Sequence, residues 1–451
     1  MPEESADDRV FSRRNIVRIA GTASAVGIAG CQGGGTDGDS DGGSGSGDTG
    51  DATASGDATL TLGAIHPLSG DAAEMGERFQ NVVSAGVQAV NQGADLEPLA
   101  GAEGEGIQGQ DGAEVEVLWR DHQGSSDVAR TEAESLILDD GADILLGSYF
   151  SGPTEVVSQV AEREGVPHVC GTAIGEGLTE RGLDWFWQVP PHTGVKGESM
   201  FDFARDMNEQ HDAGLERVAI IHQDGTFGTE VANSMVDVVS DSEFVQAPET
   251  ISYSAGSVSS LSTQIRQIQE ADADIIVHAA NVRDALIMLD DMKTEDYYPE
   301  MMLTPGSAYL DPSVLEESTS EHVFSGSDFS NDMYSIHPPM GDYNDYSVQA
   351  SDTPFDGSSI YAWGEFFTAI AAADQAESLS SADLQASLNS MSLDPYVAGL
   401  PYGVEFDDSG YNTEAFSFVV QTDDSELETV WPFDQAQDDA MTYPVPEWSE
   451  R

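Results

Sequence analysis

Short apolar runs that alternate with segments of helical period restrict the fold of this chain more than any other feature. The runs "ADILLGS", "RVAIIHQ" and "ADIIVHAA" have the length of strands, whereas "RFQNVVSAGVQAV" repeats its apolar residues as an amphipathic helix does. Continuous apolar strands separated by helices are typical of parallel sheets that are covered on both faces. The alternation therefore predicts an α/β fold, and it runs through the chain in two successive sets.

Pro190-Pro191 separates the two sets, and a chain of 451 residues is too long for one compact core. We therefore expect two lobes that are joined by crossover segments. The predicted N-terminal lobe comprises residues 58–189 with 326–415, and the predicted C-terminal lobe comprises residues 190–325 with 416–451.

Several segments carry expectations of their own. The Gly- and Glu-rich residues 93–113 predict a surface loop, and residues 358–375 and 381–390 predict helices. "YGVEFDDSGYN" predicts a hairpin, and "EAFSFVVQ" predicts a final strand. The sequence between "HVFSGSDF" and residue 358 is polar and aromatic, and no regular element is predicted there.

The charge balance is extreme, with 82 acidic against 16 basic residues and a formal net charge of −66. Such a surface repels nucleic acid, because binding to phosphates depends on lysine and arginine. High charge can also indicate disorder, but 39% hydrophobic residues with strong periodicity favour a folded protein adapted to high salt. The acids are then a solvated coat that identifies no partner.

The N-terminus has the features of an export signal. Arg13 and Arg14 precede the stretch "NIVRIAGTASAVGIAG", which is too short and too weakly apolar to span a bilayer. "SRRNIV" resembles a twin-arginine signal, and "GIAGC" resembles a lipobox with Cys31 as the lipid attachment site. Residues 1–30 are therefore expected to be a signal peptide, and residues 31–57 a flexible Gly/Ser/Asp tether. An ordinary signal peptide with an incidental cysteine is the alternative.

The stretch "LLGSYFSGPTEVVS" joins the end of an apolar strand to the start of a helix. In open parallel sheets, ligands bind beyond the carboxyl ends of the strands, and a helix N-terminus attracts anions. Ser151 can donate a hydrogen bond, the next glycine allows close approach, and Tyr149 and Phe150 offer flat apolar walls. The stretch predicts one side of a small-anion pocket. A plain turn with Ser151 or Thr154 as a helix cap is the alternative.

The sequence lacks the motifs that would indicate a common class of enzyme. The nine histidines are scattered, and the chain contains no HExxH motif and no P-loop. His66, His222 and His278 are expected to be packed or on the surface, and Cys170 to be a small core residue rather than a nucleophile. We therefore expect a binding protein without a cofactor or metal. A lipid-anchored sensor or coat protein on the same fold is a further alternative.

Five segments, taken in order and spacing, resemble one protein family. They are "IHPLSGDAAEMGERFQNVVSAGVQAVN", "LLGSYFSGPTEVVSQVAEREGVPHV", "GLTERG", "IIHQDGTFGTE" and "ADIIVHAAN". They resemble the leucine-isoleucine-valine-binding group of type I solute-binding proteins, here as a haloarchaeal-like lipoprotein, and the resemblance runs from about Leu60 to about Gln421. It implies two lobes, each a parallel sheet with helices on both faces. It also implies a monomer at the outer face of the cytoplasmic membrane that serves an ABC permease and ATPase.

The resemblance implies a ligand site that both lobes contribute to. Ser151 lies where family members bind the ligand carboxylate, Thr172 lies at the next strand-end contact, and Phe227 lies where an aromatic residue of the second lobe covers the ligand. The full set of candidate ligand-binding residues is Met75, Tyr149, Phe150, Ser151, Thr172, Ala173, Phe227, Asn281 and Asp328.

Three positions depart from the family pattern. Ile174 stands where leucine-type members have a threonine, and Phe227 lacks a phenolic hydroxyl. Gly306 stands where an acidic residue receives the ammonium of an amino acid, so we expect Asp328 as the substitute acid if the ligand is a branched-chain or related amino acid. Without such an acid, the expected ligand is an organic acid, an amide or a urea-like molecule.

Overall fold

The computed structural model describes residues 58–241, 250–254, 256–305, 307–315, 318–437 and 440–448. The predicted signal peptide and tether, with Arg13, Arg14 and Cys31, lie outside these residues, and so does Gly306. Residues 55–451 belong to one compact unit. Among the described residues, no helix combines the length and the apolar character that crossing a membrane requires.

Five parallel strands form the first sheet in the order β2-β1-β3-β4-β5. Their bounds are Thr59–His66 (β1), Glu114–Asp121 (β2), Ile144–Gly147 (β3), His168–Cys170 (β4) and Phe186–Gln188 (β5). Strand β3 is buried throughout, and its neighbouring residues Leu145 and Leu146 belong to two different hydrophobic cores. Since successive side chains of a strand point to opposite faces, both faces of this sheet are covered. The apolar run is continuous for that reason.

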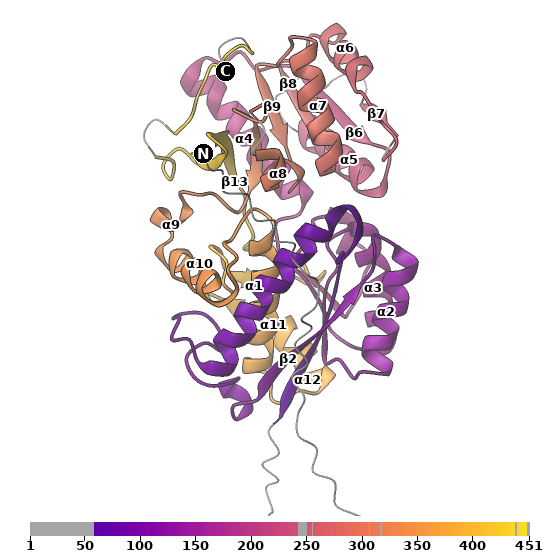
Figure 1. Cartoon of the computed structure of the whole chain (residues 1–451), viewed down its shortest axis with the longest axis vertical. Coiled ribbons are helices and arrows are strands. Elements are labelled where there is room, and N and C mark those ends of the chain that lie inside the picture. The colour runs from indigo at the N-terminus through magenta and orange to yellow at the C-terminus, as the bar shows by residue number, and fades with distance from the viewer. Residues whose placement is uncertain are drawn as a thin grey trace, which may run out of the picture. The chain divides into compact units, whose positions relative to one another are not determined.

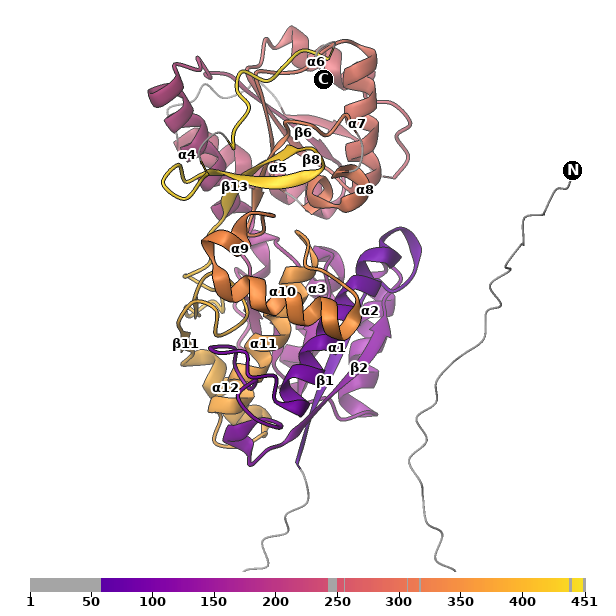
Figure 2. The same ribbon diagram turned by 60° about the vertical axis from the view of Figure 1, so that its left-hand side comes forward.

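Helices from two distant parts of the chain cover the first sheet (Figure 1). They are α1 (Ala73–Gln92), α2 (Ser126–Leu138), α3 (Ser151–Glu164), α10 (Pro338–Ser351), α11 (Ser359–Gln375) and α12 (Ser381–Asn389). Helices α1, α10 and α11 pack together on one face, and α2 packs against α3 on the other. Figure 2 shows α10 lying beside α1. We refer to the first sheet and these helices as the first lobe.

The second sheet has the order β14-β13-β10-β9-β8-β6-β7. Its strands are β6 (Val218–Gln223), β7 (Ile251–Tyr253), β8 (Ile275–Ala279), β9 (Met301–Thr304), β10 (Phe324–Ser327), β13 (Phe418–Asp423) and β14 (Glu426–Trp431). Strands β6 to β10 are parallel, whereas β13 and β14 each run antiparallel to the preceding neighbour. The expected wholly parallel sheet is therefore a mixed sheet with an antiparallel edge.

Helices also cover both faces of the second sheet. They are α4 (Thr193–His211), α5 (Thr226–Asp241), α6 (Ser262–Glu270) and α7 (Val282–Thr294). Strand residues Ile220 and Val277 pack in a core with α4 and α5, while Ile221 and Ile276 pack in a separate core with α6 and α7. We refer to this sheet and these helices as the second lobe. The predicted α/β fold is confirmed in both lobes.

The prediction that "EAFSFVVQ" is the last strand is wrong, because β14 follows β13 in a hairpin. The turn residues Asp424 and Ser425 both have positive φ, 48° and 69°. Asn-Gly or Asp-Gly would be the usual residues of such a two-residue turn, and their absence hid the hairpin from sequence reasoning. The other predicted hairpin, "YGVEFDDSGYN", is confirmed by the antiparallel bridge between Phe406 and Asn412.

Two segments that were expected to be irregular or exposed contribute to the core of the first lobe. Residues 93–113 include Leu99 and Ile107, which are buried, so this segment is more than a surface loop. Helix α10 begins at Pro338, and its buried residues Met340, Tyr343 and Ser347 are too few and too polar to mark an apolar stripe.

Candidate ligand-binding site

A cavity of about 650 Å³ lies between the carboxyl ends of strands from both sheets. The first lobe contributes the loops after β3 and β4 and the start of α1. The second lobe contributes the end of β6, the starts of α5 and α7, and the short segment after β9. This is the place where ligands bind in open α/β sheets, and the volume suits a small organic molecule.

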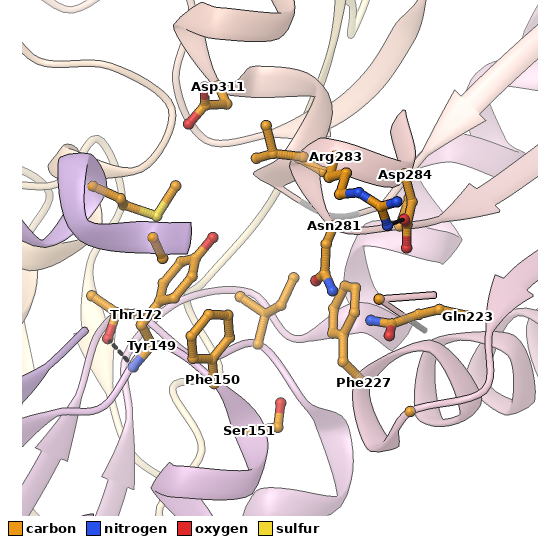
Figure 3. Close-up of a pocket in the computed structure, with 18 of the residues that line it drawn as sticks. Tyr149, Phe150, Ser151, Thr172, Gln223, Phe227, Asn281, Arg283, Asp284 and Asp311 are labelled. Carbon is orange, nitrogen blue, oxygen red and sulfur yellow. Dashed lines mark hydrogen bonds and ion pairs between the residues drawn. The ribbon is translucent and has the colours of Figure 1, made fainter. Parts of the chain in front are cut away.

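Seven of the nine candidate residues line this cavity. They are Met75, Tyr149, Phe150, Ser151, Thr172, Phe227 and Asn281. Figure 3 shows Tyr149, Phe150 and Thr172 on one side of the cavity, and Phe227 and Asn281 on the other. The residues come from segments separated by up to about two hundred positions, so the fold alone brings them together.

Ala173 and Asp328 do not line the cavity. Ala173 is buried in a small core with Cys170 and Phe186. Asp328 follows β10 and lies with its carboxylate 3.7 Å from Lys196 Nζ, and it accepts a hydrogen bond from the Tyr402 hydroxyl. The expectation that Asp328 receives a ligand ammonium is therefore corrected, since its partner is a lysine of the chain itself.

Buried side chains hold the loop between β3 and α3. The backbone N–H of Ser148 donates to Thr154 Oγ1 at 3.1 Å, and the N–H of Tyr149 donates to Thr172 Oγ1 at 3.0 Å. Thr154 in turn donates to the carbonyl of Phe150. Ser151 is the first residue of α3 rather than its cap, and within the described part of the chain no side chain caps this helix. Ser151 lines the cavity, so its side chain lies at the cavity wall.

Two neutral histidines donate hydrogen bonds to carbonyl groups of the same loop. His122 donates from Nε2 to the carbonyl of Ser148 at 2.9 Å and accepts at Nδ1 from the N–H of Gly124. His168 donates from Nε2 to the carbonyl of Gly147 at 2.7 Å. Burial lowers the pKa of His122 to about 4 and the pKa of His168 to about 3, so both rings are neutral at pH 7.

We expect acid to destabilise the chain through these two histidines. Their pKa values in the folded state lie below the 6.5 of an exposed histidine, so between pH 6.5 and these values the unfolded chain binds more protons. Above pH 6.5 these histidines do not reduce the free energy of unfolding. Below pH 6.5, down to the folded-state pKa, each histidine lowers the free energy of unfolding by about 1.4 kcal/mol per pH unit.

Urea unfolding at several pH values between 7 and 4, at constant molar KCl, measures this slope. A His168→Gln variant should lose one histidine's share of the slope, whereas His211→Gln, which alters an exposed histidine, should keep the full slope. An unchanged slope in His168→Gln would show that His168 is not buried in its neutral form.

A buried carboxylate supports the second strand-end contact. Glu365 on α11 accepts from the N–H of Gly171 at 2.6 Å and from the Thr172 hydroxyl at 3.4 Å, and its other oxygen lies 3.3 Å from His66 Nε2. The Thr172 hydroxyl is thus oriented by groups of the chain on both sides. Sequence reasoning could not find Glu365, because 193 residues separate it from Thr172.

The three histidines singled out from the sequence and the cysteine are packed, as expected. His66, His222 and His278 are buried, and His278 lies between the hydroxyl groups of Tyr253 and Tyr309. Cys170 is buried and burial raises the pKa of its thiol to about 12, which makes it a poor nucleophile.

Among the described residues, one group of side chains has the spacing of a metal site. Glu321, His322 and Asp423 bring ligand atoms within 4.8 Å of one another. The Glu321 carboxylate already accepts from the N–H of Asp424 in the β13–β14 turn, so it has a structural role there. The group lies outside the cavity lining and has no part in that site.

Sequence reasoning missed several residues of the cavity. Gln223 ends β6, and Arg283 and Asp284 lie in the first turn of α7, directly after the predicted Asn281. Arg283 and Asp284 follow Asn281 by two and three positions, so their closeness in sequence to a predicted residue could have indicated them. Tyr361 comes from α11, and nothing in the sequence indicates that it reaches the cavity.

Comparisons with known proteins agree with this architecture. Residues 59–425 match the family described as periplasmic binding protein. A Brucella abortus protein named Leu/Ile/Val-binding protein homolog 7 is 23% identical over 390 residues, which is 83% of this chain and 92% of that protein.

Solved structures share the fold at low sequence identity. A leucine-binding protein from Thermotoga maritima has 13% identity and a TM-score of 0.68, and the match covers 83% of this chain and 99% of that chain. A Streptococcus pneumoniae branched-chain amino acid transporter substrate-binding protein, in complex with isoleucine, has 17% identity and a TM-score of 0.67 over 82% of this chain and 98% of that chain. An R. palustris ABC-transporter solute-binding protein in complex with benzoate has 15% identity and a TM-score of 0.68, covering 85% and 99%. Because the family match spans most of its length, the chain belongs to the periplasmic binding protein family, whose members bind solutes for transporters rather than catalyse reactions.

Proposed function

We propose that this chain is the extracellular, lipid-anchored substrate-binding subunit of an ABC importer and that it captures a branched-chain or related amino acid. The observation that carries the proposal is the cavity itself, because strand ends of both sheets line it. The relatives named for leucine, isoleucine and valine support the amino acid, and the R. palustris protein with benzoate supports an organic acid as the alternative.

The start of α3 is the proposed carboxylate site. The first turn of a helix has N–H groups without intrahelical partners, and the helix dipole favours an anion there. Ser151 adds a hydroxyl donor at the same point. Tyr149 and Phe150, whose ring centroids are 4.9 Å apart, form an apolar wall beside it together with Met75. This combination fits a carboxylate that carries a hydrocarbon side chain.

The proposed capture step is closure of the two lobes. We propose the boundaries predicted from the sequence with one change, because β10 (Phe324–Ser327) belongs to the second sheet: residues 58–189 with 328–415 form one lobe, and residues 190–327 with 416–451 form the other. A ligand that touches both walls of the cavity binds the closed form more tightly than the open form, so it shifts the equilibrium toward closure.

Export and anchoring complete the proposal. A twin-arginine signal with Arg13 and Arg14 would export the folded chain, and lipid on Cys31 would hold it at the outer face of the membrane. The tether of residues 31–57 would leave the folded part free to meet a permease. Mass spectrometry of the membrane-bound protein tests the anchor, and an unmodified Cys31, or an N-terminus upstream of it, would refute it. A sensor with the same anchor would lack a permease partner, which co-purification from membranes can detect.

Ser151→Ala tests the carboxylate site. Hydrogen bonds to charged groups contribute about 1.5–3 kcal/mol, so we expect the variant to bind leucine about tenfold or more weakly. Calorimetry in molar KCl measures this, with 4-methylpentanoate and urea as further probes. Ser84→Ala, on the exposed face of α1, is the matched control and should bind as the unaltered protein does. If carboxylates do not bind and Ser151→Ala has no effect on the solute that does, the carboxylate site is refuted.

A further inference from the structure

Asp284 is a buried acid in the wall of the cavity. It lies in the first turn of α7, lines the cavity, and is 1% exposed. Its Oδ2 atom is buried and has no hydrogen-bond partner among the described residues. Figure 3 shows Asp284 beside Arg283 and Asn281, on the opposite side of the cavity from Thr172 and Tyr149.

Asp284 does not have the usual structural role of an acid at the start of a helix. An aspartate in the first turn of a helix commonly accepts from backbone N–H groups, but among the described residues the partner of the Asp284 carboxylate is the side chain of Arg283. That contact is long, at 3.5 Å, and the Arg283 side chain is half exposed and also donates to the carbonyl of Val258 at 2.6 Å. The arginine therefore only partly satisfies the carboxylate.

The other acids that line the cavity have partners. Glu74 lies 2.9 Å from Arg78 and is mostly exposed. Asp311 accepts from the N–H of Ser313 at 2.9 Å in the turn before the short helix α8 (Pro312–Leu315). Asp284 is thus the acid of the described cavity wall that gains most from a cationic partner, because a buried charge without one is costly.

The two sides of the cavity differ in the charge they favour. The first lobe presents the start of α3 and the Ser151 hydroxyl, which favour an anion. The second lobe's part of the wall carries two acids, Asp284 and Asp311, against one arginine, Arg283, so its net charge favours a cation despite the partial positive charge at the start of α7. A molecule with a carboxylate at one end and an ammonium at the other satisfies both sides at once.

We infer that Asp284 receives the ammonium group of the bound solute and thereby selects amino acids over the corresponding acids that lack the amino group. The inference rests on the proposed function, and it assigns the role that the family resemblance places at position 306, where this chain has a glycine. Burial raises the pKa of the Asp284 carboxyl, and a bound ammonium would offset that burial.

Matched pairs of solutes test this selection. We would measure affinities for leucine against 4-methylpentanoate and for phenylalanine against 3-phenylpropanoate, by calorimetry in molar KCl, with the unaltered protein and with Asp284→Asn. Leucine or phenylalanine should bind the unaltered protein more tightly than its deaminated counterpart. Asp284→Asn should reduce the affinity for the amino acid about tenfold or more, because the lost contact is charge-assisted. The affinity for the deaminated acid should stay unchanged or increase.

Asp311→Asn is the matched control, since it makes the same substitution at an acid of the same wall that already has a partner. It should keep the preference for the amino acid. The melting temperature of Asp284→Asn without solute should equal or exceed that of the unaltered protein, which shows that the variant folds.

The outcomes separate the two claims. If the unaltered protein prefers the amino acid and Asp284→Asn keeps that preference, the role of Asp284 is overturned while the proposed function stands. If the unaltered protein binds the deaminated acids at least as tightly as the amino acids, the amino-acid receptor and the role of Asp284 are both overturned.

Discussion

In dilute buffer the folded part of this chain should lose its cooperative melting transition, and molar KCl should restore it. The acids outnumber the bases by 66 charges. Seven described arginines already lie within 3.5 Å of a carboxylate oxygen, so few cations remain to compensate the other acids. Repulsion between the remaining acids extends over a Debye length of about 30 Å at 0.01 M salt but only about 3 Å at 1 M.

Melting followed by circular dichroism at increasing KCl measures this effect. Sucrose at the same osmolality is the control: it is excluded from the protein surface and stabilises folded states, but it does not screen charge, so it should recover much less of the transition than KCl does. Equal melting temperatures in dilute and molar KCl would contradict the adaptation to high salt.

The second large effect is expected from Asp328→Asn, which should lower the free energy of unfolding by about 3–5 kcal/mol. Lys196 and Asp328 are buried, 3.7 Å apart. Burial lowers the pKa of Lys196 and raises the pKa of Asp328, and each charge partly opposes the shift of the other. Among the described residues, the substitution leaves the buried lysine ammonium with the Tyr361 hydroxyl at 2.6 Å and the carbonyl of Gly326 at 3.5 Å as its partners.

Urea unfolding in molar KCl measures this loss, and two variants control for it. Lys293→Met alters the exposed lysine of α7 and should change the free energy of unfolding by less than about 0.5 kcal/mol. The double variant Lys196→Met with Asp328→Asn should recover part of the loss, because no charge then remains buried alone. A double variant as unstable as the sum of the two single variants would argue that the two residues act independently.

The fold followed from the sequence wherever strands are buried on both faces. The apolar sequences of β3, β6 and β8 are continuous because both faces of each sheet are covered, and this pattern identified them as buried strands. The β13–β14 hairpin and α10 were missed because turn residues with positive φ and a sparse apolar stripe give weak local signals.

The site was predictable where one strand end carries its own signal. Tyr149 and Ser151 follow an apolar strand, whereas Thr172 was expected only from the family resemblance, and the structure brings all three to the cavity. Asp328 also follows a strand, but its partner Lys196 is 132 positions away, and only the fold shows that the pair is closed to a ligand. Glu365 and Tyr361, on α11, could not be predicted either, because they are far in sequence from the other residues of the site.

The central claim is that the two lobes close on a small solute that binds between them. Small-angle scattering in molar KCl, with and without saturating leucine or the amino acid that calorimetry shows to bind more tightly, tests it most directly. The radius of gyration should decrease when the solute binds, because the closed form alone brings both walls of the cavity to the ligand. A radius of gyration that stays unchanged while calorimetry shows full occupancy would contradict the account.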